Sequence, residues 1–472
     1  MESITRLLTE QPTQYFLPLL MYNTVHMKTF DEAVQFLYSA IPKTRKTKFP
    51  ADRGLMCMRR IMELLNNPQN KLRSIHIAGT SGKGSTATFV SALLTAHGKK
   101  TGLHVKPHFI DIRERLQING HMIAKQKFVH ILNKVKQALK NLEKEKYGTA
   151  TYFELLVAMA FLWFYEEKVD YAVIETGLGG LYDGTNVIDS KEKVVLITPI
   201  GLDHTAILGN TITKIALQKA GIIQTDTIVF SSDQLQRVQK VFEQEAQRKN
   251  AQLLYVTKHT HYKKILITQT GTHFLYNHSG TFTPYSLGTI GMYQAQNASL
   301  ALMCIEYLSK RDSWKFILKQ AQKTLTITTI PGRFEKVLYK KKLLILDSAH
   351  NPQKIRAFIH TLTKLYPQQK ITYCIAIKKD KNSHAMLVHF LASAEHIVLT
   401  EFAFETMDMP LISSPAVKLY DHIPNSHTSF TSVEPNQEKA LEKAVALSSG
   451  IVVITGSMYL LAGIKQILLK QT

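Results

Sequence analysis

Residues 74–90 read SIHIAGTSGKGSTATFV. The apolar start predicts a short β-strand, the glycines that follow predict a tight loop, and the run from Ser85 predicts the start of a helix. Glycines allow successive backbone N–H groups to turn toward one point, and the positive end of the following helix points there as well. Lys83 is long enough to reach phosphates held in that turn. The stretch therefore predicts a phosphate-binding loop at the end of a strand.

The spacing of this loop differs from the common P-loop motif. Gly84 separates Lys83 from Ser85, and no glycine stands five residues before Gly82. Taken alone, the stretch is also compatible with an ordinary turn between a strand and a helix. The rest of the chain has to distinguish these alternatives.

The composition is that of a globular protein with two or three domains. The chain has 472 residues, of which 45% are hydrophobic and 20% charged. Its 58 Lys and Arg against 36 Asp and Glu give a net charge of +22. Such a charge favours anionic partners, which include nucleotides, polyanionic metabolites, nucleic acid and membrane surfaces. Because the lysines are scattered along the chain, the charge alone does not choose among them.

Cysteine usage and hydrophobicity lead us to expect a cytoplasmic protein. The three cysteines have no metal-ligand spacing, and their odd number gives no disulfide framework, so a reducing compartment fits. The most continuous apolar run, residues 155–165, is shorter than the roughly 18 residues that a membrane span needs. Residues 1–28 lack the pattern of a signal peptide, and we expect them to form an N-terminal extension.

Strand and helix patterns alternate along most of the chain, which is typical of an α/β fold with a mostly parallel sheet. Strand-like runs are expected at residues 101–105, 169–175, 194–199, 227–231 and 253–256. Residues 265–287 read instead as short antiparallel strands. A β-branched connector at residues 326–331 precedes a second alternating set. We predict a larger domain at residues 29–329 and a smaller one at residues 330–472.

Two strand ends carry side chains suited to a metal ion. Glu175 ends one β-rich run, and His204 follows Asp203 after the next run. Ligands of open parallel sheets bind at the carboxyl ends of the strands. Carboxylate and phosphate oxygens suit Mg²⁺, with an imidazole as an additional ligand. Glu175 is equally compatible with a capping or ion-paired carboxylate, and His204 with a structural histidine.

Seven motifs resemble, in order, those of the folylpolyglutamate synthase/dihydrofolate synthase family, which belongs to the Mur ligase superfamily. They are IHIAGTSGKGS at residues 75–85, ETGLGG at 175–180, PIGLDH at 199–204, LGNT at 208–211, QKAGI at 218–222, PGRFE at 331–335 and LDSAHNP at 346–352. The resemblance covers nearly the whole chain after residue 28. This family carries the additional glycine of the loop, which accounts for Gly84.

The resemblance implies an ATP-dependent carboxylate-amine ligase with a P-loop-like ATPase domain and a Rossmann-like C-terminal domain. In such a ligase ATP phosphorylates a carboxylate of a pteroate or folate, and the amine of L-glutamate attacks the acyl phosphate. The implied cofactors are ATP and Mg²⁺. The implied catalytic residues are Lys83, His204 and Lys219, and Lys219 matches a lysine that carries a carbamate in the family.

Individual contacts are also implied by the resemblance. For ATP they are Gly79, Thr80, Ser81, Gly82, Lys83, Gly84, Ser85, Asn297 near the adenine, Arg333 near the phosphates and Asp347 near the ribose. For the metal they are Ser85, Glu175 and His204. For the substrates they are Phe153 on the pterin side, and His350 and Ser457 for glutamate. Asp347 and Ser457 are also compatible with turn capping, and Phe153 with a core residue.

A Pro-containing loop after the strand at residues 101–105 adds further candidate substrate contacts, because such loops often cover substrates. These candidates are Lys106, His108 and Arg115. Lys106 stands where the family usually has a serine that faces the magnesium. Since a protonated lysine cannot ligate a metal, we hypothesise that Lys106 supplies positive charge directly to the phosphates. Two more positions depart from the family pattern, Leu181 in place of Arg and Gln218 in place of Glu.

Two other functions remain open from the sequence. One is a Mur-type ligase that acts on another carboxylate. The other is a nucleotide- or polyanion-binding protein that has lost ligation, which the net charge and Lys106 favour. For partners we expect small molecules and a monomeric chain, without membrane or nucleic acid.

Overall fold

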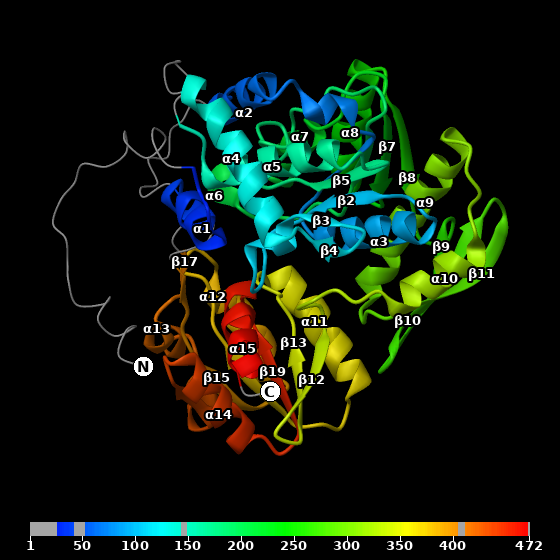
Figure 1. Ribbon diagram of the computed structural model, residues 1–472. Coiled ribbons are helices and arrows are strands. Elements are labelled where there is room, and N and C mark those ends of the chain that lie inside the picture. Colours follow the sequence, from blue (N-terminus) through cyan, green and yellow to red (C-terminus); the bar gives the residue numbers. More distant parts are fainter. Residues whose placement is uncertain (1–25, 42–51, 143–148, 405–410, 471–472) are drawn as a thin grey trace.

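The computed structural model describes residues 26–41, 52–142, 149–404 and 411–470, which form two α/β domains. In Figure 1 the N-terminal domain, blue to green, lies above the C-terminal domain, yellow to red. Within the described ranges no helix is long and apolar enough to cross a membrane. The predicted fold class is confirmed. The boundary at residues 329 and 330 stays a prediction, and most of the predicted extension, residues 1–25, lies outside the described ranges.

An eight-stranded sheet in the order β4-β3-β2-β5-β1-β6-β7-β8 organises the N-terminal domain. Six strands pair in parallel, and β3 and β4 add an antiparallel edge. The strands are β1 (Ser74–Ala78), β2 (Thr101–His104), β3 (Gln117–Ile118), β4 (His121–Met122), β5 (Tyr171–Glu175), β6 (Val194–Ile197), β7 (Ile228–Ser232) and β8 (Gln252–Val256). The prediction of a mostly parallel sheet is confirmed.

Helices cover both faces of this sheet, as a parallel sheet requires. Successive residues of β6 belong to different cores, because Val194 and Leu196 pack with α3 and α9, whereas Val195 and Ile197 pack with α7 and α8. A third core joins β5 to α1, α2, α4 and α5. The helices are α1 (Phe30–Ser39), α2 (Arg53–Leu64), α3 (Lys83–Ala96), α4 (Lys125–Leu142), α5 (Tyr152–Glu166), α6 (Thr205–Leu208), α7 (Ile212–Ala220), α8 (Gln236–Arg248), α9 (Met292–Arg311) and α10 (Leu318–Ile327), with 3-10 turns at Pro68–Lys71 and Ile112–Arg115.

A three-stranded antiparallel sheet extends from the side of the N-terminal domain (Figure 1). Its strands are β9 (Tyr262–Thr268), β10 (Gly271–His278) and β11 (Thr281–Leu287). Buried residues of β10 and β11 share a core with α9 and α10. The predicted antiparallel segment is therefore confirmed.

The C-terminal domain has a six-stranded sheet in the order β12-β13-β19-β14-β15-β18, parallel except for β12. Its strands are β12 (Glu335–Tyr339), β13 (Lys342–Leu346), β14 (Ile371–Ile375), β15 (Ala394–Leu399), β18 (Thr431–Val433) and β19 (Ile451–Thr455), beside a small pair, β16 (Ala403–Phe404) and β17 (Leu411–Ile412). The helices are α11 (Pro352–Leu365), α12 (Ser383–Leu391), α13 (Ala416–Tyr420), α14 (Gln437–Leu447) and α15 (Met458–Lys470), with a 3-10 turn at Asn425–Phe430. A parallel sheet with crossover helices is the Rossmann-like arrangement that was predicted.

Gly82 forms the tight junction between β1 and α3. It precedes the first residue of α3 with φ 90°, in the left-handed region, and a Cβ atom there would collide with the side chain of Asn297 on α9. Glycine is required here both for the backbone conformation and for the close approach of α9.

We expect Gly82→Ala to lower the free energy of unfolding by more than about 2 kcal/mol, because it adds a collision to an unfavourable φ. Gly98, just beyond the end of α3, is the matched control, since its φ is 76° and its added Cβ would meet no atom within 4 Å. Gly98→Ala should lower the free energy of unfolding only by the cost of the unfavourable φ, about 1–2 kcal/mol. Urea unfolding of both variants measures the difference, and equal losses would contradict the packing argument.

Candidate functional site

A cleft between the two domains lies at the carboxyl ends of β1, β5 and β6. The N-terminal domain contributes the loop that follows each of these strands, and the C-terminal domain contributes residues from the starts of α11 and α15 and from the loop after β14. This is the edge of a parallel sheet where ligands are expected. Of the predicted loop residues 79–85, all but Ser81 line the cleft.

The glycine-rich loop folds back over its own strand. Lys83 Nζ donates a hydrogen bond to the Gly79 carbonyl at 3.2 Å and lies 3.8 Å from Glu175 Oε1. The backbone N–H groups of Thr80 and Ser81 donate to the Pro199 carbonyl at 3.0 and 3.3 Å, so these two N–H groups face the loop after β6. The first N–H groups of α3 remain as the donors available to an anion.

Glu175 and Ser85 offer buried oxygen atoms at the base of the loop. Their exposed fractions are 4% and 3%. Glu175 Oε2 accepts a hydrogen bond from the backbone N–H of Lys106 at 3.1 Å and lies beside Gly84. A carboxylate and a hydroxyl beside a phosphate loop fit the oxygen ligands that Mg²⁺ takes together with phosphate oxygens and water.

His204 lines the same cleft, but its side chain is 39% exposed. Partial burial, together with the charges of Lys381 and Lys106, lowers the pKa of His204 to about 3. The ring is therefore neutral near pH 7, which is the form that binds a metal. In the part of the chain that the structure describes, no group of three or more His, Cys, Asp or Glu could hold a metal ion. The predicted set contains two residues of these types, Glu175 and His204, and the Ser85 hydroxyl as a third donor.

Lys219 enters the cleft from the last turn of α7 and is 4% exposed. Burial, reinforced by the positive charges of Lys83 and Lys106, lowers the pKa of Lys219 well below its usual range. A buried lysine that is surrounded by cations is driven toward the neutral amine, which is the nucleophilic form.

The two further departures from the family pattern, Leu181 and Gln218, lie against each other. The Leu181 N–H donates to the Gln218 carbonyl at 2.6 Å, and the Leu181 side chain packs on Gly221. Neither residue lines the cleft. The two departures therefore lie where the loop after β5 packs against α7.

Asp183, which the sequence did not single out, fixes this loop. Its carboxylate accepts hydrogen bonds from Leu178 N at 2.5 Å, from Thr185 N at 3.0 Å and from Thr185 Oγ1 at 2.6 Å, and Asp183 is 5% exposed. An aspartate that caps a glycine-rich turn is the signal that would have identified it.

Besides Ser81, five predicted contacts do not line the cleft, and two of them hold the surrounding structure in place. Asn297 is 2% exposed, packs against Gly82 and donates to Gln294 Oε1 at 3.0 Å. Asp347 accepts hydrogen bonds from Phe334 N and Ala349 N, each at 2.9 Å. Burial raises the pKa of Asp347, while nearby Arg333 opposes the shift. Asp347 thus has the turn-capping geometry that the sequence also allowed.

The other three lie behind the cleft. Arg115 is fully buried, and its Nε donates to His108 Nδ1 at 2.9 Å. The Arg115 guanidinium also lies 5.3 Å from the centre of the Tyr152 ring. Phe153 packs beneath Gly177, at the point where a Cβ atom would otherwise be. In this structure these residues support the walls of the cleft and do not face it.

The C-terminal domain brings the predicted Arg333, His350 and Ser457 into the cleft, together with Lys354, Lys378 and Lys381, which the sequence did not single out. The N-terminal domain adds Asp203, which was not a predicted site residue. The basic run at residues 378–381, shortly after the end of β14, and the aspartate beside His204 were the available signals.

Positive charge dominates the cleft. Two carboxylates, Glu175 and Asp203, face seven basic side chains. The basic side chains are those of Lys83, Lys106, Lys219, Arg333, Lys354, Lys378 and Lys381. A partly buried site with such an excess of cations is suited to polyanionic ligands.

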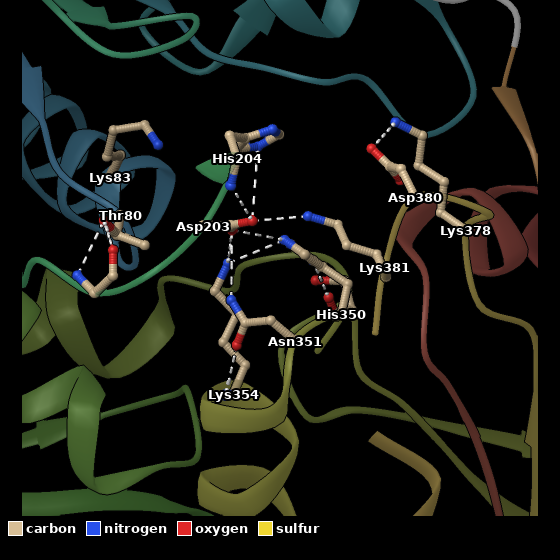
Figure 2. A network of polar contacts seen from close by, with 12 residues as sticks. Thr80, Lys83, Asp203, His204, His350, Asn351, Lys354, Lys378, Asp380 and Lys381 are labelled. Atoms are coloured by element: carbon tan, nitrogen blue, oxygen red, sulfur yellow. Dashed lines mark hydrogen bonds and ion pairs between the residues drawn. The ribbon is translucent and has the colours of Figure 1, made fainter. Parts of the chain in front are cut away.

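His350 is neutral in this environment. Burial and the charge of Lys354 lower the pKa of His350 to about 4. Its Nδ1 lies 2.8 Å from the Ser348 carbonyl and its Nε2 lies 3.1 Å from Lys354 Nζ. The neutral ring therefore carries its proton on Nδ1 and accepts from Lys354 through Nε2. Figure 2 shows these side chains directed toward Asp203.

Two protein-family models match the chain. The Mur ligase middle domain matches residues 77–305, and the dihydrofolate synthetase C-terminal domain matches residues 332–468. Among curated proteins, the dihydrofolate synthase/folylpolyglutamate synthase of Bacillus subtilis is 32% identical over 429 residues, which cover 89% of this chain and 96% of the relative. The folylpolyglutamate synthase of Lacticaseibacillus casei is 30% identical over 448 residues, with coverage of 93% and 99%.

Solved structures agree with these relatives. The Mycobacterium tuberculosis folylpolyglutamate synthase complexed with ADP and AMPPCP has a TM-score of 0.81 at 26% identity, covering 93% of this chain and 98% of that one. An FPGS–AMPPCP–folate complex has a TM-score of 0.79 at 27% identity, with coverage of 94% and 100%. By its sequence, its fold and its interdomain cleft, the chain belongs to the folylpolyglutamate synthase/dihydrofolate synthase family of ATP-dependent ligases.

Proposed function

We propose that the cleft between the domains binds ATP, a pterin carboxylate and L-glutamate, and joins the last two by an amide bond. The observation that carries this proposal is the gathering of seven basic side chains around a glycine-rich loop at the carboxyl ends of parallel strands. All three ligands are anionic, so each gains from this field. The pterin substrate is dihydropteroate, a reduced folate, or both.

The reaction proceeds in two displacements. A carboxylate oxygen of the pterin substrate attacks the γ-phosphorus of ATP, and ADP leaves. The amine nitrogen of glutamate then attacks the acyl carbon, and phosphate leaves with that carboxylate oxygen. Lys83 and the first N–H groups of α3 neutralise charge on the phosphates as it develops. Because these donors are fixed by the fold before the substrates bind, little reorganisation is needed at the moment of transfer.

Ser85, Glu175 and His204 are the residues that would hold Mg²⁺. When bound, the ion would neutralise negative charge on the phosphate oxygens and on the group being transferred. Glu175 also accepts from the backbone of Lys106, so it fixes the start of the Lys106 loop relative to the phosphate loop.

The C-terminal domain supplies the contacts for the amine substrate and for the nucleotide. Arg333 faces the phosphates, while His350 and Ser457 receive glutamate. Ser457 lies at the beginning of α15, and its Oγ already accepts from Tyr459 N at 3.2 Å. Asn297 and Asp347 act from behind the binding surface. Asn297 packs against Gly82 of the phosphate loop, and Asp347 accepts from the backbone N–H groups of Phe334 and Ala349.

Release of ADP is the experiment that tests the function. Purified protein should release ADP only when glutamate is present together with dihydropteroate or tetrahydrofolate, and each pterin should be assayed separately. Release with one pterin identifies the activity, and release with both identifies a bifunctional enzyme. No stimulation by either pterin would overturn the folate assignment and favour a Mur-type ligase for another carboxylate. Salt-sensitive polyanion binding without amide formation would favour the non-ligating alternative.

Lys219 is proposed to carry a carbamate, because a buried amine held neutral by its surroundings is able to attack CO₂. Lys219→Ala should lower kcat by roughly a hundredfold or more, since carbamates at such sites position charged groups. Short carboxylic acids such as acetate should partly restore the rate by replacing the lost anion. Lys214→Ala, an exposed lysine on the same helix, is the control. Unchanged turnover in Lys219→Ala would remove the residue from the mechanism.

Lys106 is proposed to act directly on the phosphates, because its side chain lines the cleft near enough to Lys83 and Lys219 to affect the pKa of both. We expect Lys106→Ser to raise the KM for ATP by about tenfold and to make the rate depend more steeply on the magnesium concentration. Lys106→Arg should keep most of the affinity. If Lys106→Ser leaves both dependences unchanged, Lys106 does not contact the phosphates.

A monomeric state and a cytoplasmic location stay predictions from the sequence.

A further inference from the structure

Asp203 connects the two domains across the cleft. It lies on the loop after β6 in the N-terminal domain, and its side chain is 9% exposed. Its Oδ1 lies 2.7 Å from Lys381 Nζ, and its Oδ2 lies 3.4 Å from Asn351 Nδ2 and 4.0 Å from Lys354 Nζ. All three partners belong to the C-terminal domain. Figure 2 shows Asp203 at the centre of this network.

The same loop is attached to the phosphate loop. Thr80 Oγ1 accepts from Gly201 N and donates to the Gly201 carbonyl, both at 3.1 Å. The Thr80 N–H donates to the Pro199 carbonyl at 3.0 Å. A continuous series of hydrogen bonds therefore runs from the glycine-rich loop through Thr80 and Gly201 to the backbone that carries Asp203.

The contacts of Asp203 with the basic side chains of the C-terminal domain are unequal. Its Oδ1 lies 2.7 Å from Lys381 Nζ, which is hydrogen-bond distance, whereas His350 Nε2 and Lys354 Nζ lie 3.8 and 4.0 Å from its Oδ2. A carboxylate and an ammonium group that share a hydrogen bond interact more strongly than groups at longer range. The ion pair between Asp203 and Lys381 is accordingly the main electrostatic contact of this network.

We propose that Asp203 is a positioning residue which, through Lys381, holds the glutamate-binding side of the C-terminal domain in register with the phosphate loop. The proposal rests on the proposed function, since it concerns the approach of the amine to the phosphorylated carboxylate. Ligation needs two substrates from different domains at the right separation, and a small misplacement of one of them is costly in rate. Asp203 makes no covalent contribution.

The test compares four single variants of the full chain with one double variant, which combines Asp203→Asn and Lys381→Gln. Asp203→Asn and Lys381→Gln each remove the ion pair, and Lys381→Arg keeps it. The matched control is Asp380→Asn, which changes the same charge beside Lys381 but removes an ion pair within one domain, to Lys378 at 3.2 Å. Steady-state assays with glutamate and ATP varied separately give the two KM values and kcat. Thermal unfolding of every variant separates positioning from stability.

We expect Asp203→Asn and Lys381→Gln each to raise the KM for glutamate by roughly tenfold or more, with the KM for ATP changed by less than about twofold. The KM for glutamate of the double variant should be no more than about twofold above that of the worse single variant, because both substitutions remove the same interaction. Lys381→Arg should keep the KM for glutamate within about threefold of that of the unaltered chain, because it keeps the ion pair. Asp380→Asn, outside the cleft, should leave both KM values unchanged.

Two results would overturn the proposal. One is an equal KM for glutamate in Asp203→Asn and Asp380→Asn. The other is a double variant in which the increase in this KM is the product of the two single increases. Failure of the proposed function is recognised separately, because the unaltered chain would then show no glutamate-dependent release of ADP with either pterin.

Discussion

Repulsion among like charges is the constraint on which the site depends. Seven Lys and Arg side chains share a partly buried cleft with two carboxylates, and burial opposes ionisation of those that lie deepest. Such a cluster is unfavourable by itself and becomes favourable when phosphates and carboxylates fill it. The fold must therefore hold cations together from two directions, and this explains why the cleft lies between domains.

The parallel sheet supplies one side of that arrangement. Strands β1, β5 and β6 are neighbours, so the glycine-rich loop, Glu175 and Asp203 meet at one edge although they are far apart along the chain. The loops are fixed to one another by a few buried hydrogen bonds, in which Thr80 and Asp183 take part. The C-terminal domain then adds its own strand-end groups from the opposite side. Asp203 is the point at which the two sets meet.

Sequence patterns predicted the elements that have strong periodicity and clear ends. The strands β2, β5, β6, β7 and β8 agree with their expected positions to within two residues. The antiparallel segment was expected to start at residue 265, whereas β9 begins at Tyr262. Tyr262 is buried in the core that this sheet shares with α9 and α10, a tertiary contact that local propensity cannot reveal.

The candidate site could be predicted where a motif fixes a backbone position and less well where a side chain crosses between elements. Lys83, Glu175 and Lys219 stand at turns and helix ends that the sequence marks, and the structure brings all three to the cleft. Arg115 and His108 were candidate substrate contacts on a loop expected to cover the substrate, yet they pair with each other in the interior. Contacts between distant residues decide such cases, and a single sequence contains little information about them.

The central claim is that this cleft activates a carboxylate as an acyl phosphate before the amine attacks. The most direct measurement uses a pterin substrate whose carboxylate carries a heavy oxygen isotope, ligated with glutamate and ATP, with the released phosphate analysed by mass spectrometry. The account predicts that one labelled oxygen appears in the phosphate for each amide formed, because that oxygen stays on phosphorus when the amine displaces it. Amide formation with unlabelled phosphate would contradict the account.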